Sequence, residues 1–183
     1  MNIRHWQRNF MLVLLLTGLV ACSTPAPPDD VYSKNYAMIY GSVLADDKIT
    51  EVDFFEYGKT YIRPFTRIPR VLVYDNGTFM AENIRPGKYV IAGFRSGEKN
   101  QYNLVRSGQQ AYQHVIHVKP GELKYVGSYR VHVTKSRLLG KGTFEVEEVL
   151  RPGERQILRS LQVVTEDTGW QKMIERRLKE LWQ

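Results

Sequence analysis

Short runs of β-branched and aromatic residues, separated by Gly, Pro and Asn, fill the chain from Asn35 to about Leu150. Runs of this kind predict strands, and the residues between them predict turns. About eight such strands, with turns roughly every 8 to 12 residues, favour an antiparallel β-sandwich over a parallel α/β fold. Residues 35–150 are therefore predicted to form a mainly β domain.

The clearest turn in this region is Asp75-Asn76-Gly77-Thr78. Asn-Gly between two apolar runs is the strongest short hairpin signal, because both residues tolerate positive φ. Pro86-Gly87 and Pro120-Gly121 predict two further turns. The polar stretch from Ser96 to Gln110 is predicted to be a long loop.

One long run, Glu122 to Thr134, alternates between apolar and polar residues. A regular strand would place Leu123, Tyr125, Tyr129, Val131 and Val133 on one face, and Lys124, Ser128, Arg130, His132 and Thr134 on the other. This pattern predicts a half-buried strand with a basic outer face. The run Tyr36 to Leu44 is instead apolar on both faces, which predicts a strand that is covered on both sides.

The last part of the chain, residues 151–183, changes to helical spacing. A first stripe contains Ile157, Leu158, Leu161 and Val164, and a second contains Trp170, Met173, Ile174, Leu178, Leu181 and Trp182. We expect a helical appendage whose apolar stripe packs on the sandwich. The alternative is a surface helix for a partner or a membrane, because Trp beside Lys and Arg also suits an interface.

The amino-terminal 21 residues have the order of a signal peptide. Arg4 and Arg8 precede an apolar run of 12 residues that ends at Ala21. Such a run is too short to span a bilayer, which needs roughly 18 or more apolar residues. We expect residues 1–21 to direct export and then to be removed.

The residues Leu19, Val20, Ala21 and Cys22 resemble the bacterial lipobox. This resemblance implies cleavage between Ala21 and Cys22, and a covalent lipid on Cys22 that anchors the protein to a membrane. Cys22 is the single cysteine of the chain, so an intramolecular disulfide is excluded. The Pro-rich residues 22–34 are predicted to form a flexible tether. Ser23, in place of the aspartate of an inner-membrane retention signal, favours the outer membrane with the domain facing the periplasm.

The stretch GTFMAENIRPGKYVIAGF, from Gly77 to Phe94, resembles transthyretin-like and carboxypeptidase-regulatory-like sandwiches. With Gly41-Ser42-Val43 as a first strand, the resemblance implies a prealbumin-like sandwich. Modules of this family mostly act in stability, adhesion or binding, so no activity follows from the fold. The segment Tyr57 to Pro69 and the helical tail depart from the compact module.

The net charge of the chain limits the classes of partner that we expect. The predicted signal peptide holds two of the 26 Lys and Arg residues, which leaves 24 basic and 19 acidic residues, a net charge of +5. A mildly basic surface suits an anionic envelope polymer or lipid headgroups. An exported domain does not meet nucleic acid, so we expect none as a partner.

Catalytic signatures are sparse. The sequence contains no nucleophile motif of the G-x-S-x-G or S-x-x-K kind, and lipidation would consume the Cys22 thiol. We therefore expect a non-enzymatic protein with no cofactor besides the lipid. The alternative is a metal-dependent or hydrolytic envelope enzyme that uses His117 and His132, which could approach each other if their strands pair.

A basic and aromatic set of residues gives a possible binding surface: Tyr57, Tyr61, Arg63, Arg67 and Arg130. Such residues contact glycans or anionic groups through stacking and charge. The alternating part of this set also fits a strand pair with its aromatic side in the core. The leading hypothesis is a lipid-anchored module that binds or scaffolds another envelope component. A further alternative is a pilot or chaperone that docks an exported protein through the C-terminal helices.

Overall fold

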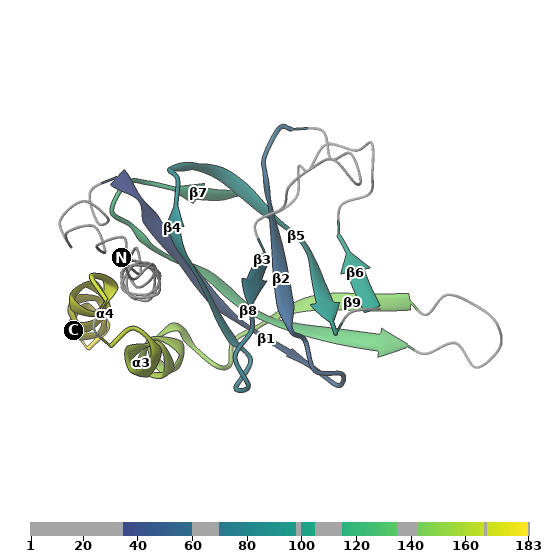
Figure 1. Cartoon of the computed structure of the whole chain (residues 1–183). Coiled ribbons are helices and arrows are strands. Elements are labelled where there is room, and N and C mark those ends of the chain that lie inside the picture. The colour runs from purple at the N-terminus through teal and green to yellow at the C-terminus, as the bar shows by residue number, and fades with distance from the viewer. Residues whose placement is uncertain are drawn as a thin grey trace, which may run out of the picture.

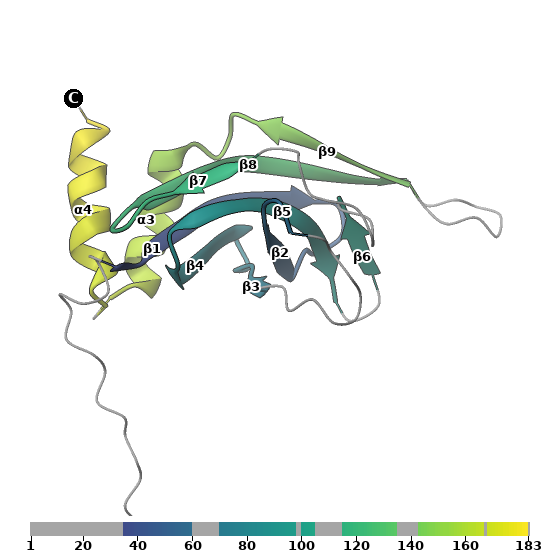
Figure 2. The same cartoon turned by 90° about the horizontal axis from the view of Figure 1, so that it is seen from above.

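The computed structural model of this 183-residue chain describes residues 35–59, 70–97, 100–104, 115–134, 143–166 and 168–182. Two β-sheets lie face to face, and two helices cross one end of them (Figures 1 and 2). The first sheet has the order β4-β1-β8-β9 and the second β3-β2-β5-β6, with β7 also paired to β5. The predicted mainly β sandwich with two C-terminal helices is confirmed.

The strands of the first sheet are β1 (Ala37–Ala45), β4 (Thr78–Ile84), β8 (Leu123–Thr134) and β9 (Thr143–Val149). The second sheet holds β2 (Glu51–Glu56), β3 (Arg70–Leu72), β5 (Gly87–Ser96), β6 (Asn100–Asn103) and β7 (Ile116–Val118). The pairings among these strands are antiparallel except that of β1 with β8, which is parallel. The sandwich is thus antiparallel apart from one central pair.

The Asn76-Gly77 turn forms as predicted. The Gly77 amide donates to the Tyr74 carbonyl oxygen at 2.8 Å, and Gly77 has a φ of 80°. The two arms of this hairpin enter different sheets, since β3 pairs with β2 while β4 pairs with β1. The turn therefore ties the two layers of the sandwich together.

The prediction of one long loop from Ser96 to Gln110 is wrong in part. Asn100–Asn103 forms β6, which pairs with β5. Its Tyr102 is buried, and its ring centroid lies 5.3 Å from that of Phe144. The sequence did not predict this strand because its residues are polar apart from Tyr102, the side chain that packs it against the core. Residues 105–110 lie outside the described residues.

The predicted face assignment along β8 is also wrong. The register with β1 steps from Tyr40–Tyr125 to Ser42–Ser128, so β8 holds an extra residue there, and Gly127 has a φ of 102°. A bulge of one residue reverses which face each later side chain occupies. Leu123 and Tyr125 consequently pack toward the helices, whereas Tyr129 and Val131 pack between the sheets.

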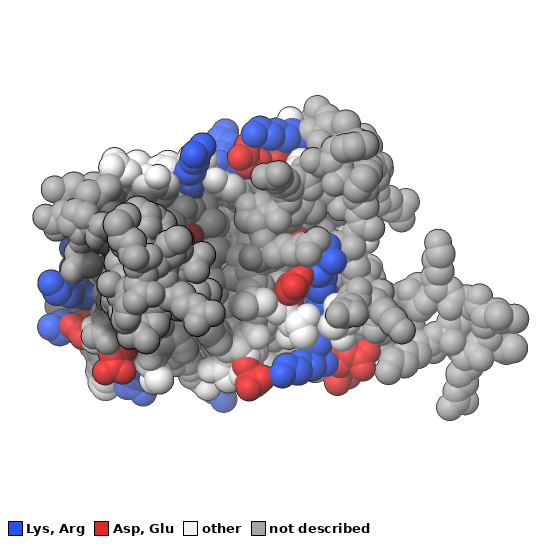
Figure 3. All heavy atoms as spheres, in the orientation of Figure 1, with Lys and Arg blue, Asp and Glu red and all other residues white. Residues whose placement is uncertain are grey.

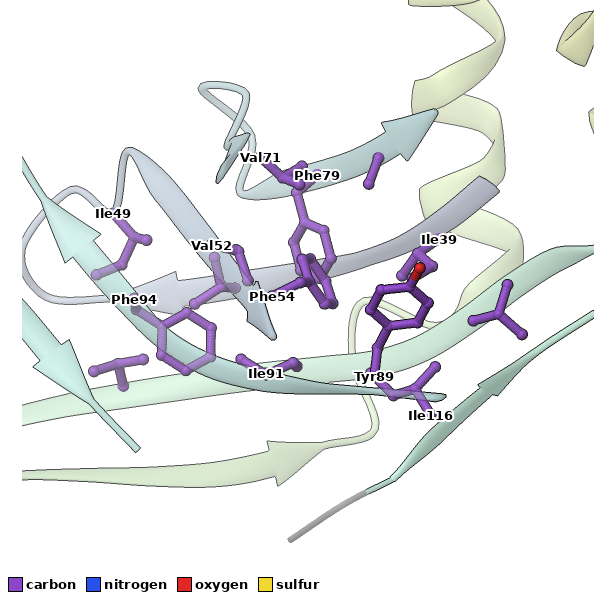
Figure 4. Packing of buried hydrophobic residues seen from close by; sticks show 14 of the residues in the cluster. Ile39, Ile49, Val52, Phe54, Val71, Phe79, Tyr89, Ile91, Phe94 and Ile116 are labelled. Atoms are coloured by element: carbon purple, nitrogen blue, oxygen red, sulfur yellow. The ribbon is translucent and has the colours of Figure 1, made fainter. Parts of the chain in front are cut away.

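Between the sheets lies the main hydrophobic core, part of which Figure 4 presents. Ile39 of β1, Phe54 of β2, Phe79 of β4 and Phe94 of β5 are its largest fully buried members. Full burial of each such side chain contributes roughly 1.5–3 kcal/mol. The rings of Phe54 and Phe79 meet across the two layers, with centroids 6.1 Å apart.

The two helices, α3 (Glu154–Val164) and α4 (Trp170–Glu180), form a second core on the other face of the first sheet. Ile157, Leu158 and Leu161 of α3 and Trp170, Ile174 and Leu178 of α4 pack there with Met38 and Tyr40 of β1. The predicted stripe is correct except at Val164 and Trp182, which are 41% and 65% exposed. Neither described helix is long and apolar enough to cross a membrane.

A polar network joins β1 to both helices beside this second core. The Tyr40 hydroxyl donates to Glu154 Oε1 at 2.7 Å, and Arg177 Nε donates to the same oxygen at 2.8 Å. Burial, and then the bond to Glu154, raises the pKa of Tyr40 well above its usual range. The bond to Glu154 likewise raises the pKa of Arg177. These groups fix the angle at which the helices meet the sheet.

Candidate binding surfaces

Several residues of the predicted sites lie outside the described residues. These are Ala21 and Cys22 at the lipobox and Tyr61, Arg63 and Arg67 of the basic and aromatic set. Their roles stay predictions. The remaining candidates are Tyr57, His117, Arg130 and His132.

Tyr57 and His117 meet at a third residue, Lys88. The Tyr57 amide donates to the Lys88 carbonyl oxygen at 2.9 Å, and Lys88 is opposite His117 in the pairing of β5 with β7. Lys88 Nζ lies 5.8 Å from the centroid of the Tyr57 ring. We call these three residues the Lys88 row.

The Lys88 row lies on the outer face of the second sheet. Next to Lys88, Tyr89 packs into the core between the sheets, so Lys88 points away from that core. His117 likewise stands between Ile116 and Val118, which are both buried in the core. The Tyr57 ring packs against a small cluster of Phe55, Val90 and Ala92 on this outer face. The row is thus a cation and an imidazole beside an aromatic ring that rests on an apolar base.

Among the described residues, no acidic side chain offsets the charge of the Lys88 row. Lys88 and His117 are exposed, and no described acidic side chain forms an ion pair with either. The nearby Lys59 pairs with Glu56. A cation over an aromatic face that keeps its charge can attract an anionic group of a ligand.

Arg130 lies elsewhere, on β8 of the first sheet. Its Nη1 atom is 3.8 Å from Glu147 Oε1 on β9, and His132 Nε2 is 3.2 Å from the same oxygen. One carboxylate of β9, that of Glu147, therefore lies against both Arg130 and His132 of the strand that was predicted to have a basic face. On the face that Figure 3 shows, basic and acidic side chains are interspersed among the described residues. Tyr57 and Arg130 do not form one surface.

The two candidate metal ligands do not share a site. His117 is on β7 in the second sheet and His132 is on β8 in the first, and the two strands do not pair. Within the described ranges, no group of three His, Cys, Asp or Glu side chains could hold a metal ion. The alternative of a site at His117 and His132 required their strands to pair, and this condition is not met.

A second basic and aromatic surface lies on the helices. The Arg155 guanidinium stacks 3.3 Å from the centroid of the exposed Trp182 ring, and that of Arg159 is 5.8 Å away. Lys179 is exposed one turn before Trp182, whose amide donates to the Lys179 carbonyl oxygen. We call these four residues the Trp182 surface. Helical spacing had placed Trp182 on the buried stripe, while the alternative of a surface helix had rested on Trp beside Lys and Arg.

A groove of about 300 Å³ runs between α4 and the turn from β7 to β8. Its lining includes Gly121 and Glu122 from the turn and Arg176 and Glu180 from the helix. Glu122 Oε2 accepts the Lys119 amide at 2.7 Å, and Arg177 Nη1 donates to Glu180 at 3.1 Å. Most of its polar lining thus serves the local structure.

No family model matches this chain, and no curated protein matches it. Solved structures resemble it over part of its length. A DUF3823 family protein from Parabacteroides merdae is 13% identical with a TM-score of 0.32, covering 64% of this chain and 61% of that one. A DUF3823 family protein from Bacteroides ovatus is 13% identical with a TM-score of 0.29, covering 64% and 59%.

A third similar structure is a protein from Bacteroides fragilis that carries the description "putative cell adhesion protein". It is 9% identical with a TM-score of 0.32, and the match covers 63% of this chain and 45% of that one. The chain thus spans less than two thirds of each of these three proteins. The likeness is distant and transfers no function.

Proposed function

We propose that this protein is a lipoprotein of the bacterial envelope, anchored through Cys22, whose β-sandwich binds another envelope component without catalysis. The anchor rests on the lipobox-like residues Leu19 to Cys22 after a short apolar run. Ser23 favours the outer membrane with the domain in the periplasm. The transthyretin-like resemblance of Gly77 to Phe94 agrees with a binding module and adds no chemistry.

The observation that carries the binding role is the Lys88 row. A lysine over the Tyr57 ring, next to His117, suits a ligand that offers a phosphate or carboxylate beside an apolar or sugar face. The net charge of +5 that remains after residue 21 attracts the same class of ligand. The proposed partner is therefore an anionic envelope polymer, or an envelope protein with an acidic surface.

The anchor is tested by the mass and location of the protein in cells. We expect the mature chain to begin at Cys22, to carry lipid, and to fractionate with the outer membrane. Cys22→Ser should leave the signal peptide in place and remove the lipid. Ser23→Asp is the matched variant, because it keeps the lipid and should move the protein to the inner membrane. A wild-type chain without lipid would contradict the anchor.

The binding role is tested by co-sedimentation with isolated anionic envelope polymer at increasing salt. Lys88→Ala should weaken binding several-fold and flatten the salt dependence, since one exposed charge is lost. Lys48→Ala is the control, because Lys48 is also exposed but pairs with Asp75 at another edge of the sandwich. Equal binding by both variants and the wild type would refute the role of the Lys88 row.

A further inference from the structure

The Trp182 ring lies outside the second core and contacts the helices only through the stacked Arg155 and the nearby Arg159 in the described part of the chain. The second core is filled by Trp170, Ile174 and Leu178, whereas Trp182 is 65% exposed. Arg155, Arg159 and Lys179 surround it, and none of them forms an ion pair in the described part of the chain. Two acids of these helices, Glu154 and Glu180, are held by Arg177.

An exposed tryptophan among free cations matches the chemistry of a bilayer surface. The amphipathic indole ring is favoured at the level of the lipid headgroups. Lys and Arg side chains beside it are attracted by anionic headgroups. The exposed Val163 continues the Arg155–Arg159 side of α3, and a basic helix side with a few apolar groups is the pattern of a helix that lies on a lipid surface.

The described chain enters the domain at this same end. The Gly121 amide donates to the Tyr36 carbonyl oxygen at 2.8 Å, just before β1 begins. Gly121 also lines the groove that Arg176 and Glu180 of α4 complete. The chain therefore enters the domain beside α4, as the start of β1 in Figure 2 also shows.

The tether limits how far this end can move from the membrane. Only 12 residues separate Cys22 from Asn35. Fully extended, they span at most roughly 45 Å. Because they join the domain beside α4, a chain anchored at Cys22 can lay its helical end on the bilayer.

We propose that the helical end of the domain lies on the membrane, with Trp182 at the headgroup level and Arg155, Arg159 and Lys179 against anionic lipid. This inference rests on the proposed lipid anchor at Cys22. It assigns the surface that faces the bilayer, and it leaves the Lys88 row for the envelope partner.

The mature protein contains its own probes of this orientation. Of the three tryptophans, Trp6 leaves with the proposed signal peptide, Trp170 is 3% exposed in the second core, and Trp182 is exposed. The acylated protein is placed in vesicles of phosphatidylcholine and phosphatidylglycerol whose acyl chains are brominated. We expect most of the Trp182 emission to be lost relative to unbrominated vesicles, and the emission of Trp182→Phe to be unchanged.

Charge provides the second readout. Arg159→Glu should reduce the quenching by brominated lipid several-fold. The wild type should show a similar reduction in brominated vesicles that contain phosphatidylcholine alone. Lys48→Glu, at an exposed lysine of another edge, should leave it unchanged. Equal quenching of wild type and Trp182→Phe, in a chain whose mass shows the lipid, would overturn this inference alone. A chain without lipid would overturn the anchor and this inference together.

Discussion

Gly41 marks the closest approach of β1 to its neighbours. A Cβ atom at this position would lie 2.6 Å from the Gly127 carbonyl oxygen and 2.7 Å from the Phe79 ring. One of these contacts is backbone at the β8 bulge, and the other is a fully buried ring. Neither can move without disturbing the core between the sheets.

We predict that Gly41→Ala lowers the free energy of unfolding by about 1–3 kcal/mol, the usual cost of overpacking a core. Gly87→Ala is the matched control, since the nearest atom to its added Cβ is 3.5 Å away. It should change stability by less than about 0.5 kcal/mol. Urea denaturation of both variants measures the difference, and equal midpoints would contradict the close approach.

Tyr129 makes stability depend on alkaline pH. Burial, together with the charge of Glu148, raises its pKa from 10.0 to about 12. The folded state therefore holds the proton more tightly than the unfolded state. The resulting stabilisation is complete below pH 10 and is lost as the pH rises through about 12.

We expect Tyr129→Phe, which keeps the ring, to lose less stability than the wild type between pH 10 and 12. The measurement is the free energy of unfolding at several pH values in this range. Parallel curves for the two proteins would show that Tyr129 does not contribute.

Helix α3 belongs to the folded core of the domain and is not a mobile extension. Leu158 is fully buried between α3 and the first sheet, while Val163 on the other side of the helix is 74% exposed. Leu158→Ala should therefore cost about 2–5 kcal/mol of stability. Val163→Ala should cost less than about 0.5 kcal/mol. Equal effects in a denaturation experiment would mean that the helix does not pack as described.

The sequence predicts elements well where local pattern decides them. The Asn76-Gly77 turn formed where the local sequence predicted it, and helical spacing identified both helices. Local pattern fails where one residue changes the register. The extra residue of β8 at Gly127 does not interrupt the alternation of apolar and polar residues in the sequence. It nevertheless moves the side chains after it to the opposite face of the sheet.

The candidate surfaces were harder to predict than the fold. The Lys88 row exists because β2 and β7 both pair with β5, and such long-range pairings leave no local pattern. Tyr57 and His117 were each recognised, but for different sites. Lys88 was missed because a lysine in an alternating strand is ordinary until its neighbours are known.

As a whole, the molecule is built around β1. Ile39 points into the core between the sheets, while Met38 and Tyr40 point into the core under the helices. Because β1 contributes side chains to both cores, each core loses part of its packing when β1 detaches. The stability of one core therefore depends on that of the other. We predict that both cores unfold in one cooperative transition.

Trp170 in the second core tests this prediction. In a Trp182→Phe background of the mature chain, its fluorescence reports only the core under the helices. The far-UV circular dichroism signal reports the strands and helices together. The two should have the same urea midpoint, and a lower midpoint for Trp170 fluorescence would show that the helices detach first.

The position of β1 also determines how the anchored protein would respond to force. A pull on the tether reaches the start of β1, which is bonded to β4 on one side and to β8 on the other. Tension directed along β1 would shear it against both neighbours. The hydrogen bonds of the two ladders would then have to break at the same time. Peeling an edge strand would instead break its bonds one after another. An anchor at Cys22 would thus load the sandwich through a strand that two hydrogen-bonded ladders hold.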